Sequence, residues 1–144
     1  MSEVVGYAAG AFDMFHIGHL NLLRNAAARC DRLIAGVVSD ELILARKDRL
    51  PVVPLVERLE IVSRIEYVDI AVVEDRDSKL DMWGDLRFTA LFKGDDWRGS
   101  VKGEELERDF AHTGVEIVYL PYTAHTSSTL LRSYVEGRAV PHVS

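Results

Sequence analysis

The segment VVGYAAGAFDMFHIGHLNLL (residues 4–23) changes its hydrophobic pattern in the middle. Residues 3–9 are mostly β-branched and small apolar residues and are followed by a glycine, which is typical of a buried strand. From residue 18 to residue 29 the apolar side chains recur at helical spacing. Between these patterns lie His16 and His19, two of the five histidines of the chain. The segment therefore predicts a strand, a turn that carries two imidazoles, and a helix.

The rest of the chain alternates in the same way between short apolar runs and helix-periodic segments. Further strands are predicted at 32–38, 68–74, 90–94 and 115–121, and further helices after residue 39 and at 55–65, 80–86, 103–114 and 127–137, with 45–54 as a loop. This alternation predicts an α/β fold, a doubly wound, Rossmann-like parallel sheet of five strands with helices on both faces. A length of 144 residues suits one domain over 1–144, with a loose C-terminal tail from about residue 136.

Composition excludes several classes of partner. The formal net charge of −6 argues against general attraction to nucleic acid or to anionic membranes. No apolar run approaches the roughly 18–20 residues that cross a bilayer, and no signal-peptide pattern is present at the N-terminus. Cys30 is the only cysteine, so an intrachain disulfide is impossible and a reducing compartment is favoured. We therefore expect a cytoplasmic protein that binds neither nucleic acid nor membrane.

The two histidines suit phosphoryl chemistry. In a doubly wound sheet the ligand binds beyond the carboxyl ends of the strands, where the strand order reverses. His16 and His19 would lie there at the start of a helix, whose free N–H groups and dipole attract anions, and Gly18 lets a phosphate approach the backbone. The sequence does not tell whether the imidazoles act as cations or as neutral donors. A zinc site, which lacks a nearby third ligand, and a purely structural helix cap are the alternatives.

Three motifs resemble those of a known family. GAFDMFHIGHLNLL (10–23) resembles the GxFDxxHxGH signature of the nucleotidyltransferase superfamily, which includes cytidylyltransferases and adenylyltransferases. FKGDDWRG (92–99) is similar to the GDDW segment of glycerol-3-phosphate cytidylyltransferases, and YLPYTAHTSSTLLR (119–132) to their RTxGISTT motif. This resemblance spans residue 4 to about 135. It implies transfer of CMP from CTP, with Mg²⁺, to a small phosphorylated alcohol or a related phosphosugar or phosphonate, with release of pyrophosphate, by a homodimer.

The resemblance also implies roles for individual residues. His16 and His19 would be catalytic at the α-phosphate, together with Lys47 from a loop that could close over the triphosphate. The nucleotide would be bound by Gly10, Ala11, Phe12, Gly18, Gly94, Asp96, Trp97, Ser127, Ser128 and Thr129. The acceptor and its phosphate would be bound by Asp13, Arg58, Tyr122 and His125. No motif forms a metal site by itself, so the nucleotide phosphates would hold Mg²⁺, with Asp13 as a further candidate.

Structural alternatives stay open for several of these residues. An aspartate in a tight turn often bonds its own backbone, as Asp13 would, and Ser127 suits a simple helix cap. Trp97 after a strand is as compatible with a core position as with a base pocket. Arg58 on a helix could pair with a neighbouring glutamate at the surface.

The acceptor half departs from the family pattern. Tyr122 and Glu66 stand at two positions where the family has arginine, His125 replaces a glycine, and Ala11 replaces a threonine. His125 and Arg132 are candidates to replace the lost positive charge. Since the nucleotide half is better kept, we expect an acceptor other than, or broader than, glycerol 3-phosphate. An adenylyltransferase of the same superfamily, with ATP as donor, and a catalytically weak regulatory module that binds a nucleotide are the alternative functions.

Overall fold

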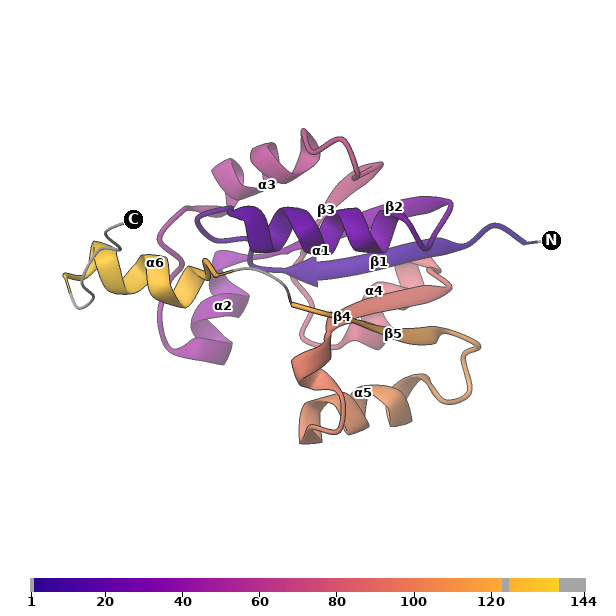
Figure 1. Ribbon diagram of the computed structural model, residues 1–144. Coiled ribbons are helices and arrows are strands. Elements are labelled where there is room, and N and C mark those ends of the chain that lie inside the picture. The colour runs from indigo at the N-terminus through magenta and orange to yellow at the C-terminus, as the bar shows by residue number, and fades with distance from the viewer. Residues whose placement is uncertain (1, 123–124, 138–144) are drawn as a thin grey trace.

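The computed structural model describes residues 2–122 and 125–137, and these residues form a five-stranded sheet (Figure 1). The strands are β1 (Val5–Gly10), β2 (Arg32–Val38), β3 (Ile70–Glu74), β4 (Ala90–Gly94) and β5 (Glu116–Leu120). Their order is β3-β2-β1-β4-β5 and all neighbouring pairs are parallel, which confirms the doubly wound α/β fold. The order reverses between β1 and β4, so Gly10 and Gly94 mark the edge where such sheets bind ligands.

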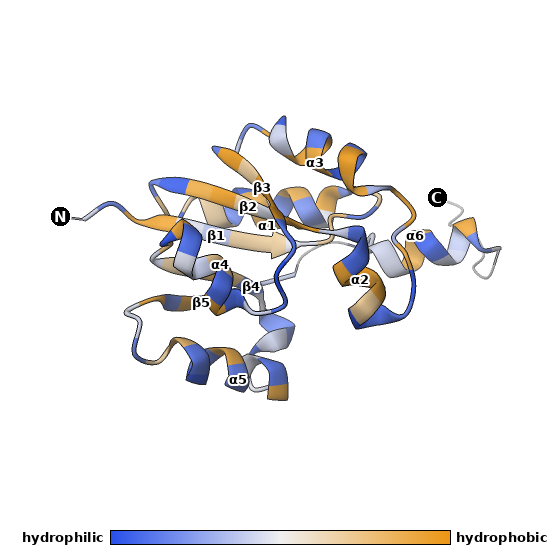
Figure 2. Ribbon diagram, turned by 180° about the vertical axis from the view of Figure 1, so that it is seen from behind, coloured by the Kyte–Doolittle hydropathy of each residue, from blue (hydrophilic) through white to orange (hydrophobic). Residues whose placement is uncertain are grey.

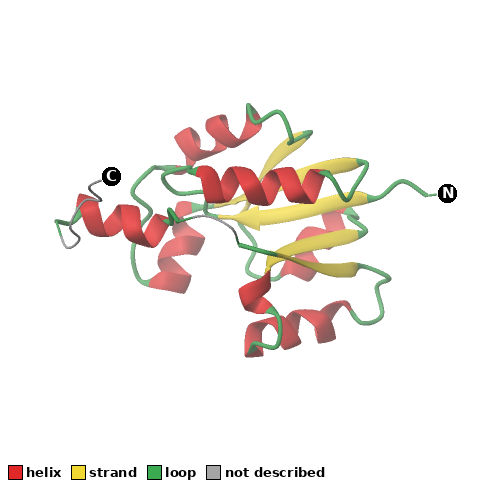
Figure 3. Ribbon diagram, viewed as in Figure 1, coloured by secondary structure: helices red, strands yellow, loops and turns green. Residues whose placement is uncertain are grey.

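Helices cover both faces of the sheet, as the alternating pattern predicts. They are α1 (Ile17–Ala27), α2 (Asp40–Lys47), α3 (Leu55–Ser63), α4 (Lys79–Leu86), α5 (Val101–Phe110) and α6 (Ser128–Val135), with a 3-10 turn, η1 (Asp95–Trp97), directly after β4. Helices α1 and α3 cover one face and α4 and α5 the other, while α2 and α6 lie beyond the carboxyl ends of the strands (Figures 1 and 3). Within the described part of the chain, no helix is long and apolar enough to span a bilayer.

Alternation of side chains along each strand builds one core on each face. On β1, Ala8 packs with residues of α1 and α3, whereas Tyr7 packs on the opposite face with residues of α4 and α5. The Tyr7 ring stacks on Phe88 with 4.8 Å between centroids. Because both faces are covered, strands β2 and β3 are apolar along much of their length, whereas the helices have polar and apolar sides (Figure 2). Packing on both faces therefore fixes the positions of the carboxyl ends of the strands, where the candidate site lies.

The main local difference from the sequence-based prediction concerns 45–54. The composition predicts a loop there, but helix α2 continues through Lys47. Ser39 caps this helix by accepting the Leu42 N–H at 3.2 Å, and acidic residues in the first turn and basic residues in the last turn suit the helix dipole. The helix ends where Asp48 takes a left-handed conformation at φ 56°. Lys47 thus lies at the C-terminus of a helix. The predicted loose tail falls almost entirely outside the described residues.

Candidate active site at the switch point

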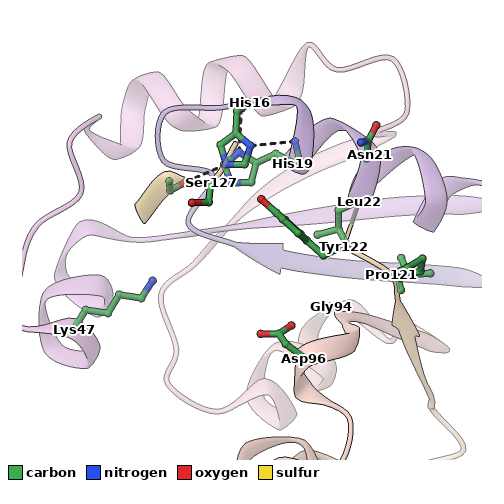
Figure 4. A pocket seen from close by; sticks show the side chains of 13 residues that line it. His16, His19, Asn21, Leu22, Lys47, Gly94, Asp96, Pro121, Tyr122 and Ser127 are labelled. Atoms are coloured by element: carbon green, nitrogen blue, oxygen red, sulfur yellow. Dashed lines mark hydrogen bonds between the residues drawn. The ribbon is translucent and has the colours of Figure 1, made fainter. Parts of the chain in front are cut away.

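Two cavities open beyond the carboxyl ends of the strands. The larger, about 430 Å³, is here called the histidine cavity and is lined by His16, Gly18, His19, Asn21, Leu22, Lys47, Gly94, Asp96, Leu120, Pro121, Tyr122, Ser127 and Ser128 (Figure 4). The smaller, about 240 Å³, is called the lysine cavity and is lined by Ala9, Gly10, Ala11, Val38, Ile43, Arg46, Lys47, Lys79, Lys93 and Trp97. Lys47 lines both, so the two cavities are neighbours.

His16 and His19 form a reciprocal cap at the start of α1. Nδ1 of His16 accepts the N–H of Gly18 at 3.0 Å, and Nδ1 of His19 accepts the N–H of His16 at 3.2 Å. The two ring centroids are 3.9 Å apart (Figure 4). Because Nδ1 of each ring accepts a backbone N–H, the proton of each neutral ring lies on Nε2. The structural cap thereby gives both rings the same tautomer.

Burial keeps both imidazoles uncharged near neutral pH. It lowers the pKa of His19 to about 3, with the neighbouring His16 as the second cause. Burial also lowers the pKa of His16 below its usual 6.5. The pair is therefore poised as two neutral Nε2–H donors, which answers the question that the sequence leaves open. Donors fixed in advance stabilise negative charge that develops during a reaction.

Gly18 lies where a side chain would collide with both neighbours. A Cβ at this position would lie 2.8 Å from Cε1 of His16 and 2.9 Å from the hydroxyl oxygen of Tyr122. The Tyr122 hydroxyl donates a hydrogen bond to the carbonyl of Thr126. Because Gly18 has no side chain, the imidazole of His16 and the ring of Tyr122 can both lie close to the backbone at the N-terminus of α1.

A second helix N-terminus borders the histidine cavity. Ser127 caps α6 by accepting the N–H of Leu130 at 3.0 Å. The Ser128 hydroxyl donates to the carbonyl of Asp13 at 2.7 Å and lies 3.4 Å from Nε2 of His16, which fixes α6 against the histidine turn. Two helix N-termini at one cavity favour a ligand with several negative charges, because each offers free N–H groups and a partial positive charge.

Asp13 lies behind the histidine turn and outside the lining of both cavities. It is 2% exposed, and its carboxylate accepts the N–H groups of Val52 and Val53 at 2.9 and 2.8 Å. It also pairs with Arg132 at 2.8 Å, so both oxygens of the Asp13 carboxylate are engaged by the protein itself. Asp13 is a positioning residue that ties the turn to residues 52–53 and to α6. Within residues 2–122 and 125–137, no group of three or more His, Cys, Asp or Glu side chains lies together in a way that could hold a metal ion.

Arg58 also supports the site from behind and does not face a ligand. It is 1% exposed, and its guanidinium donates to the carbonyls of Ala11, Val38 and Val53 at 2.7, 2.8 and 2.8 Å. It pairs with Asp40 at 2.6 Å. These partners occupy the guanidinium, which corrects the expectation that Arg58 binds the acceptor.

The structure divides the other predicted residues between the two cavities. Gly18, Gly94, Asp96, Ser127 and Ser128 line the histidine cavity as a nucleotide-binding set would. Tyr122, expected to bind the acceptor, lines the histidine cavity, whereas Gly10, Ala11 and Trp97, expected to bind the nucleotide, line the lysine cavity. Three residues line neither: Phe12 is buried in the core, and Thr129 and His125 are exposed.

The sequence analysis missed most of the lysine cavity. Lys79 opens α4, Lys93 lies in β4, and Arg46 lies in α2 beside Lys47. These residues come from three separate elements, so no spacing in the sequence marks them as a group. The available signal was a lysine within the short, otherwise apolar strand ALFKG, directly before the GDDW motif.

Comparison with known proteins agrees with the motifs. The family model described as Cytidylyltransferase-like matches residues 7–133. The chain is 33% identical over 129 residues to "Bifunctional protein HldE" of Hyphomonas neptunium, which covers 88% of this chain and 26% of that protein. It is 42% identical over 97 residues to "Ethanolamine-phosphate cytidylyltransferase" of Arabidopsis thaliana, which covers 62% of this chain and 22% of that protein. The chain thus spans about a quarter of the length of these curated relatives.

A solved structure shares the fold. The crystal structure of the lipopolysaccharide core biosynthesis protein from Thermoplasma volcanium superimposes with a TM-score of 0.71 at 18% identity and covers 87% of this chain and 100% of that one. At this identity the likeness concerns the fold alone. The family model, however, matches nearly the whole described chain, including all three motifs. The chain therefore belongs to the cytidylyltransferase-like family of nucleotidyltransferases, as its motifs predict.

Proposed function

We propose that this chain transfers CMP from CTP to the phosphate or phosphonate group of a small acceptor and releases pyrophosphate. The observation that carries the proposal is the pair of neutral Nε2–H donors, His16 and His19, at a helix N-terminus in the histidine cavity. Membership of the cytidylyltransferase-like family supports the class of reaction. The choice of CTP rests on that family and on the GDDW resemblance around Asp96.

The transfer would be a single in-line displacement. An oxygen of the acceptor phosphate forms a bond to the α-phosphorus while the bond from that phosphorus to the oxygen shared with the β-phosphate breaks. That oxygen keeps the bonding electron pair and leaves as part of pyrophosphate. Such a reaction needs positioning and charge neutralisation, with no covalent intermediate on the protein.

The residues of the histidine cavity suit these tasks. His16 and His19 would donate to the non-bridging oxygens of the α-phosphate, whose negative charge grows as the acceptor attacks. Ser127 and Ser128, at the start of α6, would face the β- and γ-phosphates. Lys47 lines both cavities and would lie between the nucleotide and the incoming phosphate. Mg²⁺ would enter as part of the magnesium–nucleotide substrate, held mainly by the phosphates of the nucleotide.

ATP is the second candidate donor, because the carboxylate that would bind the base, that of Asp96, can accept a hydrogen bond from adenine as well as from cytosine. Asp96 is exposed at the histidine cavity and offers a carboxylate that accepts from an exocyclic amine. Cytosine and adenine both carry such an amine, whereas uracil does not. The site therefore favours CTP or ATP over UTP.

The direct test is release of pyrophosphate in the presence of Mg²⁺. CTP, ATP, GTP and UTP, each labelled at the α-phosphate, are crossed against phosphorylated alcohols, phosphosugars and phosphonates. We expect release with CTP and an equal amount of labelled nucleotidyl product. His19→Ala should reduce the rate by about 10²–10³-fold, the usual cost of one aimed donor, while His112→Ala, an exposed histidine far from α1 in the sequence, should not.

The other outcomes decide between the alternatives. Release with ATP alone would make the chain an adenylyltransferase. Tight binding of a nucleotide, without release for any acceptor, would identify a regulatory module instead. A rate that survives His19→Ala would remove the histidine pair from the mechanism.

We also propose, from the family resemblance, that the protein is a cytoplasmic homodimer. Sedimentation equilibrium should give the mass of two chains, whereas a mass of 16.2 kDa would identify a monomer and contradict the proposal. Fractionation of cells that express the full-length natural protein would test its location.

A further inference from the structure

On the basis of the proposed transfer, we propose that the acceptor carries a second negative group besides the attacking phosphate, and that Lys93 in the lysine cavity binds this group. The acceptor would then be a small phosphate or phosphonate ester with a carboxylate or a second phosphate. An amino-alcohol phosphate would be excluded.

The lysine cavity lies where an acceptor must lie. It borders Gly10 and Ala11 at the end of β1, and it shares Lys47 with the histidine cavity. A molecule in it can therefore present a phosphate toward a nucleotide at the histidine pair. The lysine cavity adjoins a further cavity of about 540 Å³, which shares Arg46, Lys47, Lys79 and Trp97 with it, so the acceptor has room to extend beyond the lysine cavity. The acceptor phosphate would lie near Lys47, and the rest of the molecule would extend toward Lys93.

Positive charge exceeds negative charge on the walls of this cavity. Glu74 is 0% exposed and accepts hydrogen bonds from the Tyr7 hydroxyl at 2.7 Å and from Nζ of Lys79 at 2.6 Å. Arg46 lies 3.7 Å from the same carboxylate and 3.3 Å from the exposed Asp77. One buried carboxylate thus serves two cations.

Lys93 and Lys47 lack a carboxylate of this kind. Within the described ranges, neither of them has a carboxylate oxygen within 4.0 Å of its ammonium nitrogen. Nζ of Lys93 lies 4.1 Å from the centroid of the Trp97 ring, so the ammonium faces an aromatic ring. Two cations on the walls of one cavity are therefore available to separate negative groups of a ligand.

The electrostatic state of Lys93 supports a negative ligand. Burial, together with the nearby Lys79, lowers the pKa of Lys93 to about 7, against the opposing effect of Glu74. Holding a buried ammonium without a counter-charge costs free energy, so a ligand that brings a negative charge would restore the charged form. An ammonium-bearing ligand would add a third positive charge beside Lys79 and Lys93.

This chemistry separates the chain from one of its relatives. The Arabidopsis protein is named for ethanolamine phosphate, an acceptor that carries an ammonium group. In the present chain an ammonium at that end would face the lysines of the cavity. A neutral hydroxyl group would avoid repulsion but would leave Lys93 without a charged partner. A carboxylate or phosphate satisfies it directly, because hydrogen bonds between charged groups are the stronger kind.

A matched series of two-carbon acceptors tests the proposal. Phosphoglycolate, 2-hydroxyethyl phosphate and phosphoethanolamine share the phosphate and differ at the other end by a carboxylate, a hydroxyl and an ammonium. We expect kcat/KM to fall in that order, by about tenfold or more from the first to the last, since one charge-assisted contact is gained with the carboxylate and a like-charge repulsion appears with the ammonium. Ethylene glycol bisphosphate, in parallel, distinguishes a second phosphate from a carboxylate.

Variants assign the preference to Lys93. Lys93→Met should bring the three kcat/KM values close together with the KM for CTP unchanged, and Lys93→Arg should keep the order. Arg108→Met, at an exposed position of α5 and outside the lining of the lysine cavity, is the matched control. An unchanged order in a folded Lys93→Met protein, or a preference for phosphoethanolamine in the natural sequence, would overturn the proposal.

Binding measured without turnover separates this proposal from the proposed function. Calorimetric titration of the three acceptors should show the same order of affinity, and Lys93→Met should remove it. Charge-selective binding with no nucleotidyl transfer for any nucleotide would refute the proposed function while keeping the anion site. Transfer activity without any preference among the three acceptors would support the proposed function and refute the anion site at Lys93.

Discussion

The histidine cavity and the lysine cavity are organised in opposite ways. In the first, the functional side chains are satisfied by backbone groups: His16 and His19 accept N–H groups through Nδ1, and Ser127 caps α6. In the second, cations outnumber the buried carboxylate, and Lys93 has no ion-pair partner among the described residues. The contrast teaches that hydrogen-bond donors can be fixed in position by the backbone before a ligand binds, as in the histidine cavity. Cations without a counter-charge, as in the lysine cavity, would instead be neutralised by the ligand itself.

The largest effects should come from the buried carboxylate behind each cavity. Asp13 holds α6 and residues 52–53 behind the histidine cavity, and Glu74 holds Lys79 behind the lysine cavity. Asp13→Asn and Glu74→Gln should each lower the free energy of unfolding by up to about 3–5 kcal/mol, because each leaves buried cations without a partner. Denaturant unfolding of both variants beside the parent protein measures this loss.

The same two variants should separate in their kinetics. Asp13→Asn loosens α6, so the KM for the nucleotide should rise about tenfold while acceptor selectivity stays. Glu74→Gln removes a negative charge beside Lys79 and Arg46, so the KM for a doubly negative acceptor should fall at a pH low enough to keep Lys93 charged. Asp77→Asn, an exposed partner of Arg46, is the control for general charge effects. If both buried variants changed the same KM in the same direction, the two cavities would not be independent.

A pH series tests the lysine cavity more finely. Because the pKa of free Lys93 is lowered to about 7, this residue is charged below that pH and loses its proton above it. The KM for phosphoglycolate should therefore rise several-fold from pH 6.5 to 8.5. The groups that act on Lys93 are Lys79, Glu74, Arg46 and Asp96. Lys79 titrates in the same direction, since burial lowers its pKa as well.

The Lys93→Arg variant isolates the contribution of Lys93 in this series. A guanidinium keeps its charge throughout the range, so the KM for phosphoglycolate should change much less with pH than in the parent protein. The second ionisation of the acceptor phosphate, near pH 6, affects both proteins equally. A parallel rise in parent and variant would mean that another group causes the pH dependence.

The sequence predicted the fold and the histidine cavity because their signals are local. A strand, a turn and a helix follow one another in 4–23, and the residues that cap α1 are the motif residues themselves. The lysine cavity joins β1, β2, α2, α4, β4 and η1, which come together only after the sheet has formed. The sequence predicts that Asp13 and Arg58 face a ligand, because it shows only that both residues are charged. The folded chain shows that backbone N–H and carbonyl groups already hydrogen-bond to both side chains.

The smallest effect concerns Tyr122, which stands where the family has an arginine. The sequence assigns this position to the acceptor, yet the ring lines the histidine cavity next to Gly18, and its hydroxyl donates to the carbonyl of Thr126. Tyr122→Phe removes that bond, whose net value of about 0.5–1.5 kcal/mol corresponds to a few-fold change in binding. The KM for CTP should rise by this factor, and kcat/KM ratios among the acceptors should stay unchanged. Tyr134→Phe, on α6 and outside both cavities, should alter neither quantity. A change in acceptor selectivity in Tyr122→Phe would instead return this residue to the acceptor and would place the boundary between the two cavities elsewhere than at Lys47.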